Sequence, residues 1–442
     1  MTAVSLRSPH DRAIFRLAIP ALGALAADPL VALIDTAYVG RLGSAALGAV
    51  AVAGAMFSVA VAGFNFLAYG TTPLVATRLG SGDREAAARM AGAAVWVAVV
   101  AGLVATALLL AFPEVLLGWL GASEELLGPG VTYLRIRSVG LVAVLYLTAA
   151  SGIFRGAQDA VTPLRAILVL NVVNLVLDPL LIFVLGWGVA GAAWSSVAGQ
   201  VVGAAMLAGV LRRPGALGFR PSRPRRADVV ALSTAGSRLI LRTFGLLAVF
   251  TAATGVAARL GTTAVAGHQV ASQLFLFLAL VLDAIAIAAQ SVVGKAVGEH
   301  DAPLVRQLAD RLVVLGTAAG LVLAVLLAVV APWLGHWFTP DAAVVAALAT
   351  IYPQLVLIQV LGGAVFAWDG IVIGATDFTY AMAATVAPAV VTLVWLGGVL
   401  AFDGDLEAVW WGIVLLMVLR AAMLAWWHRV RLPAAARFRP AE

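Results

Sequence analysis

The sequence contains no cysteine and one lysine, Lys295, and only 11% of its 442 residues are charged. Without cysteine the chain forms no disulfide, no thiolate metal site and no cysteine nucleophile. It also lacks a phosphate-binding glycine loop followed by lysine, an H-E-x-x-H pair and a G-x-S-x-G turn, and its five histidines are scattered. We therefore expect neither an enzyme nor a nucleotide-driven pump, and no cofactor or resident metal.

The chain is instead rich in apolar residues. Hydrophobic residues make up 63% of it and the mean hydropathy is +1.04. Apolar runs long enough to cross a bilayer as helices recur throughout, which indicates an all-α integral membrane protein. The twelve predicted spans are 13–38, 45–77, 86–112, 130–154, 163–185, 189–211, 228–258, 264–297, 304–331, 343–373, 379–402 and 407–428.

The second half of the chain repeats the first at a constant offset of 218 residues. The run Arg41–Gly43 returns as Arg259–Gly261, and Trp119 returns as Trp337. Six spans per repeat is an even number, so both halves enter the membrane from the same side and form parallel repeats. We expect two six-helix lobes: an N-lobe over 1–211, a basic linker over 212–227 and a C-lobe over 228–442. This architecture is typical of secondary transporters.

Arginine placement predicts the orientation, because cytoplasmic loops are enriched in basic residues. Arginines gather before the first span, in the 2–3 and 4–5 connections, in the linker and after the last span. Both termini are therefore expected in the cytoplasm, in a multi-pass protein of the cell inner (plasma) membrane. The sequence indicates no nucleic-acid partner and no need for more than a monomer. The arginines so counted are Arg7, Arg12, Arg16, Arg78, Arg84, Arg89, Arg155, Arg165, Arg212, Arg213, Arg220, Arg223, Arg225, Arg226, Arg429, Arg431, Arg437 and Arg439.

Tryptophans near the predicted span ends suit anchoring at the membrane interface. They are Trp119, Trp187, Trp333, Trp337, Trp410, Trp411, Trp426 and Trp427.

Acidic residues inside the predicted spans are the main candidates for function, since a carboxylate in hydrocarbon is costly. Asp35 and Asp178 both lie late in outward-running spans, at similar depth. Asn174 is four residues before Asp178 and shares its helix face, and Asp28 lies two turns before Asp35. At the repeat offset Asp35, Asn174 and Asp178 correspond to alanine, threonine and leucine, so a role in the shared scaffold does not explain them.

A plainer interpretation exists for two of these acids. Asp28 and Asp178 each precede a proline, as an N-cap does before proline at the first helical position. Either residue therefore suits a helix that restarts after a break. Asp35 has no such explanation.

The second half offers a different polar group. Arg238 and Arg242 are four residues apart on the seventh span, and Asp283 lies at comparable depth on the eighth. They suit either a buried ion pair that joins two helices, or an anion-binding or gating group. Gln269 and Gln290 on the eighth span are candidates for a polar path, or for interhelical hydrogen bonds.

These motifs resemble the multidrug and toxic compound extrusion (MATE) family over nearly the whole chain. Ala27–Gly43 resembles its first helix, and the Ala-Asp-Pro motif with Leu241–Thr243 is most similar to the DinF branch, which includes plant citrate exporters. The other matching segments are Arg155–Asp159, Asn174–Pro179, Gly267–Gln269, Leu282–Ala284 and Ala289–Gln290.

The resemblance implies a twelve-helix antiporter in which Asp35, Asn174 and Asp178 form a cation-coupling site. DinF-type members are thought to couple to protons, and some relatives couple to sodium. Asp28 is an additional acid that is not general to the family.

We therefore expect a multidrug efflux protein that exchanges amphipathic organic cations for protons by alternating access. Its partners are this small-molecule substrate, protons and membrane lipid. The alternatives are export of an organic anion such as citrate, favoured by Arg238 and Arg242, sodium coupling, and a lipid-linked glycan flippase. The acidic first half argues against the flippase, and asymmetric repeats argue against a continuous ion channel.

Overall fold

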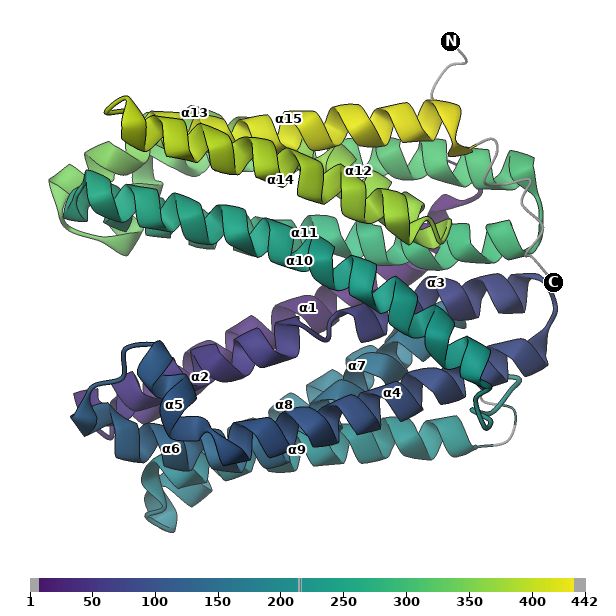
Figure 1. Cartoon of the computed structure of the whole chain (residues 1–442), viewed down its shortest axis with the longest axis horizontal. Coiled ribbons are helices and arrows are strands. Elements are labelled where there is room, and N and C mark those ends of the chain that lie inside the picture. Colours follow the sequence, from purple (N-terminus) through teal and green to yellow (C-terminus); the bar gives the residue numbers. More distant parts are fainter. Residues whose placement is uncertain (1–7, 214, 216, 433–442) are drawn as a thin grey trace. The chain divides into compact units, whose positions relative to one another are not determined.

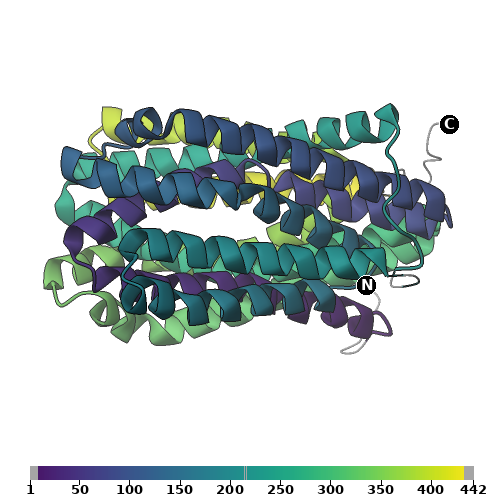
Figure 2. The same ribbon diagram turned by 90° about the horizontal axis from the view of Figure 1, so that it is seen from below.

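The computed structural model of the chain describes residues 8–213, 215 and 217–432, and over these ranges it contains helices and no strand (Figures 1 and 2). In both views the helices of each part run along a common direction. Three of the arginines used to orient the chain, Arg7, Arg437 and Arg439, lie outside the described residues.

Among the described residues, eleven helices are long and apolar enough to cross a membrane, and the count is twelve if the bent pair Glu124–Val139 and Leu141–Gly156 forms one span. The predicted all-α membrane protein with twelve spans is therefore confirmed. These segments are apolar, as spans in hydrocarbon must be. They are helical because a helix satisfies its backbone polar groups within one segment.

The described chain divides into two compact units. The first unit is Ile19–Gly236, and the second joins the segment up to Ala18 with the chain from Ser237 onward. Helices α1 (Asp11–Gly40) and α10 (Arg226–Leu260) each begin in one unit and end in the other.

The first unit contains the greater part of α1 and the start of α10. Its other elements are α2 (Ser44–Ala62), α3 (Phe66–Gly80), α4 (Arg84–Ala111), α5 (Pro113–Trp119), α6 (Glu124–Val139), α7 (Leu141–Gly156), α8 (Val161–Pro179), the π-helix η1 (Leu180–Val184) and α9 (Gly188–Arg212).

The second unit contains the rest of α10 and five further helices. They are α11 (Thr262–Gly298), α12 (Ala302–Phe338), α13 (Ala342–Gly374), α14 (Phe378–Ala401) and α15 (Leu406–Val430). In this unit the first turns of α1 are held by an ion pair, in which Arg311 of α12 donates to Asp11 through two nitrogens at 2.7 Å.

The sequence repeat reappears in the helix boundaries. Helices α2 and α11 begin at Ser44 and Thr262, and α4 and α12 begin at Arg84 and Ala302, so each pair is offset by 218 residues. The two halves nevertheless differ in continuity. Gly63 lies at the break between α2 and α3, and Gly140 at the 45° bend between α6 and α7, whereas α11 and α13 continue unbroken through Val281 and Ile358. Glycine makes such interruptions easier because it stabilises a helix interior less than alanine does.

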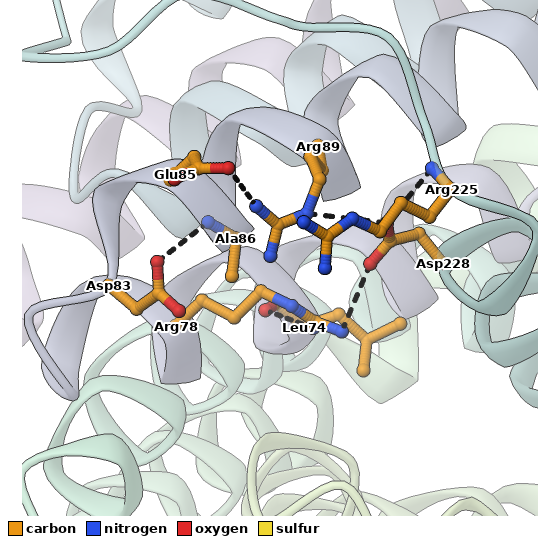
Figure 3. Close-up of polar contacts among 8 residues, drawn as sticks. All are labelled: Leu74, Arg78, Asp83, Glu85, Ala86, Arg89, Arg225 and Asp228. Atoms are coloured by element: carbon orange, nitrogen blue, oxygen red, sulfur yellow. Dashed lines mark hydrogen bonds and ion pairs between the residues drawn. The ribbon is translucent and has the colours of Figure 1, made fainter. Parts of the chain in front are cut away.

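The linker and the start of α10 are fastened to the first unit by a polar cluster around Asp228, which is buried. Its carboxylate lies 3.9 Å from Arg78 and 3.7 Å from Arg89, and it accepts the backbone N–H of Arg225 at 3.2 Å. Figure 3 shows these side chains of α3 and α4 pointing toward Asp228.

The linker backbone also lies directly on α4. Ser222 donates its N–H to the carbonyl oxygen of Ala88 at 2.9 Å. A Cβ added at Gly92 would overlap the carbonyl oxygen of Ser222, so this close approach requires glycine. The segment that precedes α10 therefore packs against the first unit through Ser222.

Two tryptophans do not serve as interfacial anchors, contrary to the sequence-based interpretation. Trp410 and Trp427 of α15 are 0% exposed. Trp427 donates its indole N–H to Asp377 at 2.9 Å, at the start of α14. Helical rotation, which residue type does not reveal, turns these two rings into the second unit, while Trp411 and Trp426 beside them stay exposed.

Candidate functional site

Asp178 lies at the centre of a buried polar cluster in the first unit. It is 1% exposed and accepts a hydrogen bond from the hydroxyl of Ser195 on α9. Asn174, one turn earlier on α8, donates its side-chain amide to Ser195 at 3.2 Å and to Ser196 at 3.4 Å. The α8–α9 pair therefore presents a carboxylate, an amide and two hydroxyls to one place.

The local backbone is unusual at this position. Pro179 lacks the N–H that an α-helix would use, and the chain continues from it as the π-helix Leu180–Val184. Single π-helical turns are frequent at functional sites. The side chain of Asp178 caps no helix here, because its hydrogen-bond donor is Ser195 and the π-helix has no side-chain cap. The capping interpretation of Asp178 is therefore wrong.

Asp35 on α1 meets Asp178 directly. Its carboxyl group lies within interaction distance of the carboxyl group of Asp178, and Asp35 is half-buried. An ionised carboxylate only accepts hydrogen bonds, so a hydrogen bond between two carboxyl groups requires a proton on one of them. The second carboxyl oxygen of Asp178, Oδ2, is buried and has no nitrogen or hydroxyl donor among the described residues. The pair therefore has the geometry to hold one proton between two acids.

A guanidinium completes the charges of this cluster. Arg137 of α6 lies close enough to Asp35 to attract its carboxylate. Tyr133, one turn earlier on α6, lies near the charges of Arg137, Asp35 and Asp178. The Arg137 guanidinium lies over the ring of Phe57 of α2, 4.3 Å from its centroid, as in a cation–π contact. Aromatic packing thus holds one positive charge beside two acids.

Asp28 lies beside this cluster and is bonded separately. Its carboxylate accepts the side-chain amide of Asn171 on α8 at 3.4 Å. Helix α1 runs without interruption from Asp11 to Gly40 and includes Pro20 and Pro29. Asp28 therefore caps no restarted helix, and the capping interpretation is wrong for this residue as well. Its exposed side chain adds a third acid on the same face of α1 as Asp35.

In the second unit the strongest polar group is an ion triad. Arg242 of α10 donates to Asp369 of α13 at 2.8 Å, and Arg420 of α15 donates to the same carboxylate oxygen. Asp369 and Arg420 are 3% and 1% exposed, and the side chain of Arg242 is 17% exposed, so the triad buries one positive and one negative charge and half-buries a second positive charge. This arrangement joins three helices.

The other sequence-based candidates of this unit are more dispersed. Arg242 forms its ion pair with Asp369, a residue that the sequence reasoning did not consider, and Arg238 and Asp283 are half-buried. Gln269 is exposed and Gln290 is buried. The structure therefore adds Asp369 to the polar residues around Arg242.

Sequence reasoning missed several residues that the structure brings to these clusters, although the repeat contained a signal for them. Each is polar or charged in one half and apolar or smaller at the offset position in the other. Asn171, Ser195, Arg137 and Tyr133 correspond to Ala389, Ile413, Leu355 and Ile351, and Asp369 and Arg420 correspond to Ser151 and Val202.

Within the described ranges, no group of three or more histidine, cysteine, aspartate or glutamate residues is arranged to hold a metal ion.

Comparisons with known proteins find relatives over nearly the whole chain. A family model described as MatE matches residues 20–180 and 239–396, which include Asp35, Asp178 and Asp369. Protein DETOXIFICATION 44, chloroplastic, of Arabidopsis thaliana is 34% identical over 432 residues, covering 93% of this chain and 81% of the relative. DNA damage-inducible protein F of Escherichia coli (strain K12) is 29% identical over 440 residues, covering 96% and 93%. A crystal structure of MATE in the bent conformation matches with a TM-score of 0.90 at 24% identity over 97% of each chain.

Proposed function

Since the chain belongs to the MATE family of membrane transporters, we propose that it is an efflux antiporter that exchanges amphipathic organic cations for protons. The observation that supports proton coupling is the proximity of the carboxyl groups of Asp35 and Asp178, since a hydrogen bond between them would need a proton on one of the two groups. No enzymatic step is involved, and the energy comes from an ion gradient.

A charge count explains how one site serves both partners. With one shared proton, Asp35 and Asp178 carry one negative charge, which the guanidinium of Arg137 balances. Without the proton the three groups carry a net negative charge in a low-dielectric region, where an uncompensated charge is costly. Either a proton or a monovalent organic cation removes that cost. The two ligands therefore compete, and mutually exclusive binding is the basis of exchange.

The exchange also requires the site to open to each side in turn. We assign the coupling site to the N-lobe, residues 1–211, and the C-lobe, 228–442, to its partner in alternating access, with 212–227 as the connecting linker. The exposed arginines of the linker support a cytoplasmic position for it in a bacterial-type inner membrane. Both chain termini are then cytoplasmic, and a monomer suffices.

A second candidate function is export of an organic anion such as citrate. It is favoured by the triad Arg242–Asp369–Arg420, in which two arginines share one carboxylate within the second unit. A carboxylate substrate would be attracted to these two guanidinium groups. In this case Asp35 and Asp178 would still couple the transport to protons.

The test is transport by the purified chain in liposomes with an imposed proton gradient and no sodium. The native protein is compared with Asp35→Asn, and with Asp341→Asn as a matched control, because Asp341 is an exposed helix cap far along the sequence from the cluster. We expect the native protein and the control to move a lipophilic cation such as tetraphenylphosphonium, and Asp35→Asn to lose this activity.

Three other results would change the assignment. Equal transport by native protein and Asp35→Asn would refute coupling through this carboxyl. Transport that appears only when a sodium gradient replaces the proton gradient would establish sodium coupling. Transport of citrate but not of tetraphenylphosphonium would establish the anion exporter.

A further inference from the structure

The second unit has an open groove whose lining includes no residue of the two polar clusters described above. Its volume is about 470 Å³, and it lies between the end of α14 and the first three turns of α15. That volume falls within the range of ligand-binding pockets, which is roughly 300–1,000 Å³. Its lining includes Trp395, Asp405, Glu407, Trp411, Val414 and Val418.

The lining has two chemically different ends. Two acids, Asp405 and Glu407, and the exposed indole of Trp411 lie at the beginning of α15, and the exposed indole of Trp395 reaches them from α14. Beyond them the floor is apolar: positions 407, 411, 414 and 418 follow the helical spacing of one face, so Val414 and Val418 continue the groove along α15. The surface therefore has an acidic aromatic head and an apolar tail.

The aromatic wall is held in place by specific contacts. Trp395 donates its indole N–H to the carbonyl oxygen of Ala408 at 2.8 Å. Its ring also lies so close to Gly412 that a Cβ added there would come within 2.7 Å of the ring. Because the ring is fixed by a hydrogen bond and by a close approach that requires glycine, the groove does not depend on a mobile side chain.

The charge at the head selects a cation. Asp405 caps α15 by accepting the N–H of Ala408 at 2.8 Å, and Glu407 follows in the first turn. A bare helix N-terminus attracts anions with roughly half an elementary charge, and two carboxylates outweigh that charge. Indole faces add attraction for an ammonium or phosphonium group. A phospholipid would bring a phosphate to the same acids, so a ligand with net positive charge fits better.

The first half of the repeat lacks the side chains that line this groove. At the offset of 218 residues, Trp395, Glu407 and Trp411 correspond to Leu177, Val189 and Ala193. The tryptophans and the acid are thus additions to this half, and a scaffold role common to both halves does not account for them. In a bilayer, tryptophan alone suits the interface, but the paired acids beside the groove are not needed for anchoring.

We propose that this α14–α15 groove binds amphipathic organic cations, as a membrane-facing site that is separate from the Asp35–Asp178 cluster. The inference rests on the proposed function for the identity of the ligand, which is the exported substrate class. In the proposed orientation the α14–α15 turn lies at the outer surface. The groove would then hold a cation at the outer leaflet, with its charge at the head and its apolar part along α15.

The experiment measures equilibrium binding of tetraphenylphosphonium to the full chain in a non-ionic detergent. The Asp35→Asn variant isolates the groove from the inner cluster, and Glu407→Gln and Trp411→Leu are each added to it. Glu124→Gln is the matched control, since Glu124 is also an exposed acid in a first turn. We expect Asp35→Asn to retain one class of binding site, which either groove substitution weakens about two- to fivefold and the control leaves unchanged.

The ligand's charge and source are tested in the same assay. Tetraphenylborate has the same shape with the opposite charge and is expected not to compete. Its competition would show an apolar surface only and overturn the proposal, as would binding that Glu407→Gln and Trp411→Leu leave intact. Displacement by lysophosphatidylcholine would assign the groove to a phospholipid instead. Transport by Asp35→Asn decides the proposed function separately, because this binding assay does not depend on it.

Discussion

Removing the single acid of the triad Arg242–Asp369–Arg420 should destabilise the second unit strongly. Asp369→Asn keeps the size of the side chain and removes the charge that two arginines share. The side chain of Arg420 is only 2% exposed, so water cannot solvate its guanidinium group when Asp369 no longer carries a charge. Breaking a buried ion pair in this way costs about 3–5 kcal/mol. For a unit of this size each kcal/mol lowers the melting temperature by roughly 2–4 °C, so we expect a fall on the order of 10 °C.

The assay is thermal unfolding of the purified protein in detergent, followed by intrinsic fluorescence. The matched control is Asp310→Asn, because Asp310 also contacts two basic residues, His428 at 2.7 Å and Arg306 at 3.8 Å, but is 54% exposed. A pair of that exposure contributes at most about 1 kcal/mol. Similar melting temperatures for the two variants would refute this reasoning about buried charge. Replacing all three triad residues by Met, Leu and Met should recover most of the loss.

Two further changes test individual contacts. Ser195→Ala removes a hydroxyl that donates to the buried carboxylate of Asp178, so we expect a loss of about 1–3 kcal/mol in unfolding free energy and slower proton-driven transport; a stable and fully active variant would contradict the assigned contact. Gly92→Ala forces the carbonyl of Ser222 off α4, so trypsin should cleave the arginine-rich linker faster than in Gly209→Ala, where an added Cβ meets open space, and equal cleavage rates would show that the linker is not seated there.

Much of the fold was predictable because hydrophobic run length reports membrane spans directly. The breaks at Gly63 and Gly140 were not, since an isolated glycine inside an apolar run is tolerated as often as it interrupts a helix. The buried positions of Trp410 and Trp427 also depend on the rotation of α15 about its axis. Sequence spacing determines which residues share a face, but not which neighbour that face meets.

Some residues of the candidate site could be predicted from the sequence, and others could not. Asp35, Asn174 and Asp178 stood out because acids and amides are costly in hydrocarbon. Arg137 and Ser195 needed the positions of α6 and α9 before they could be connected with the acids.

In the second unit, Arg242 was recognised, but its partner Asp369 on α13 was not. Comparing the two halves position by position would have singled out Asp369 and Arg420 as well.

The central claim is that a proton and an organic cation compete for the Asp35–Asp178 pair. The most direct measurement is proton release by purified protein in a weakly buffered solution when tetraphenylphosphonium is added. Asp178→Asn removes the shared proton, and Asp310→Asn serves as a control that keeps the pair intact. The account predicts proton release that rises with bound cation in the native protein and in the control, and that is lost in Asp178→Asn. Saturable cation binding by the native protein with no release of protons would contradict it.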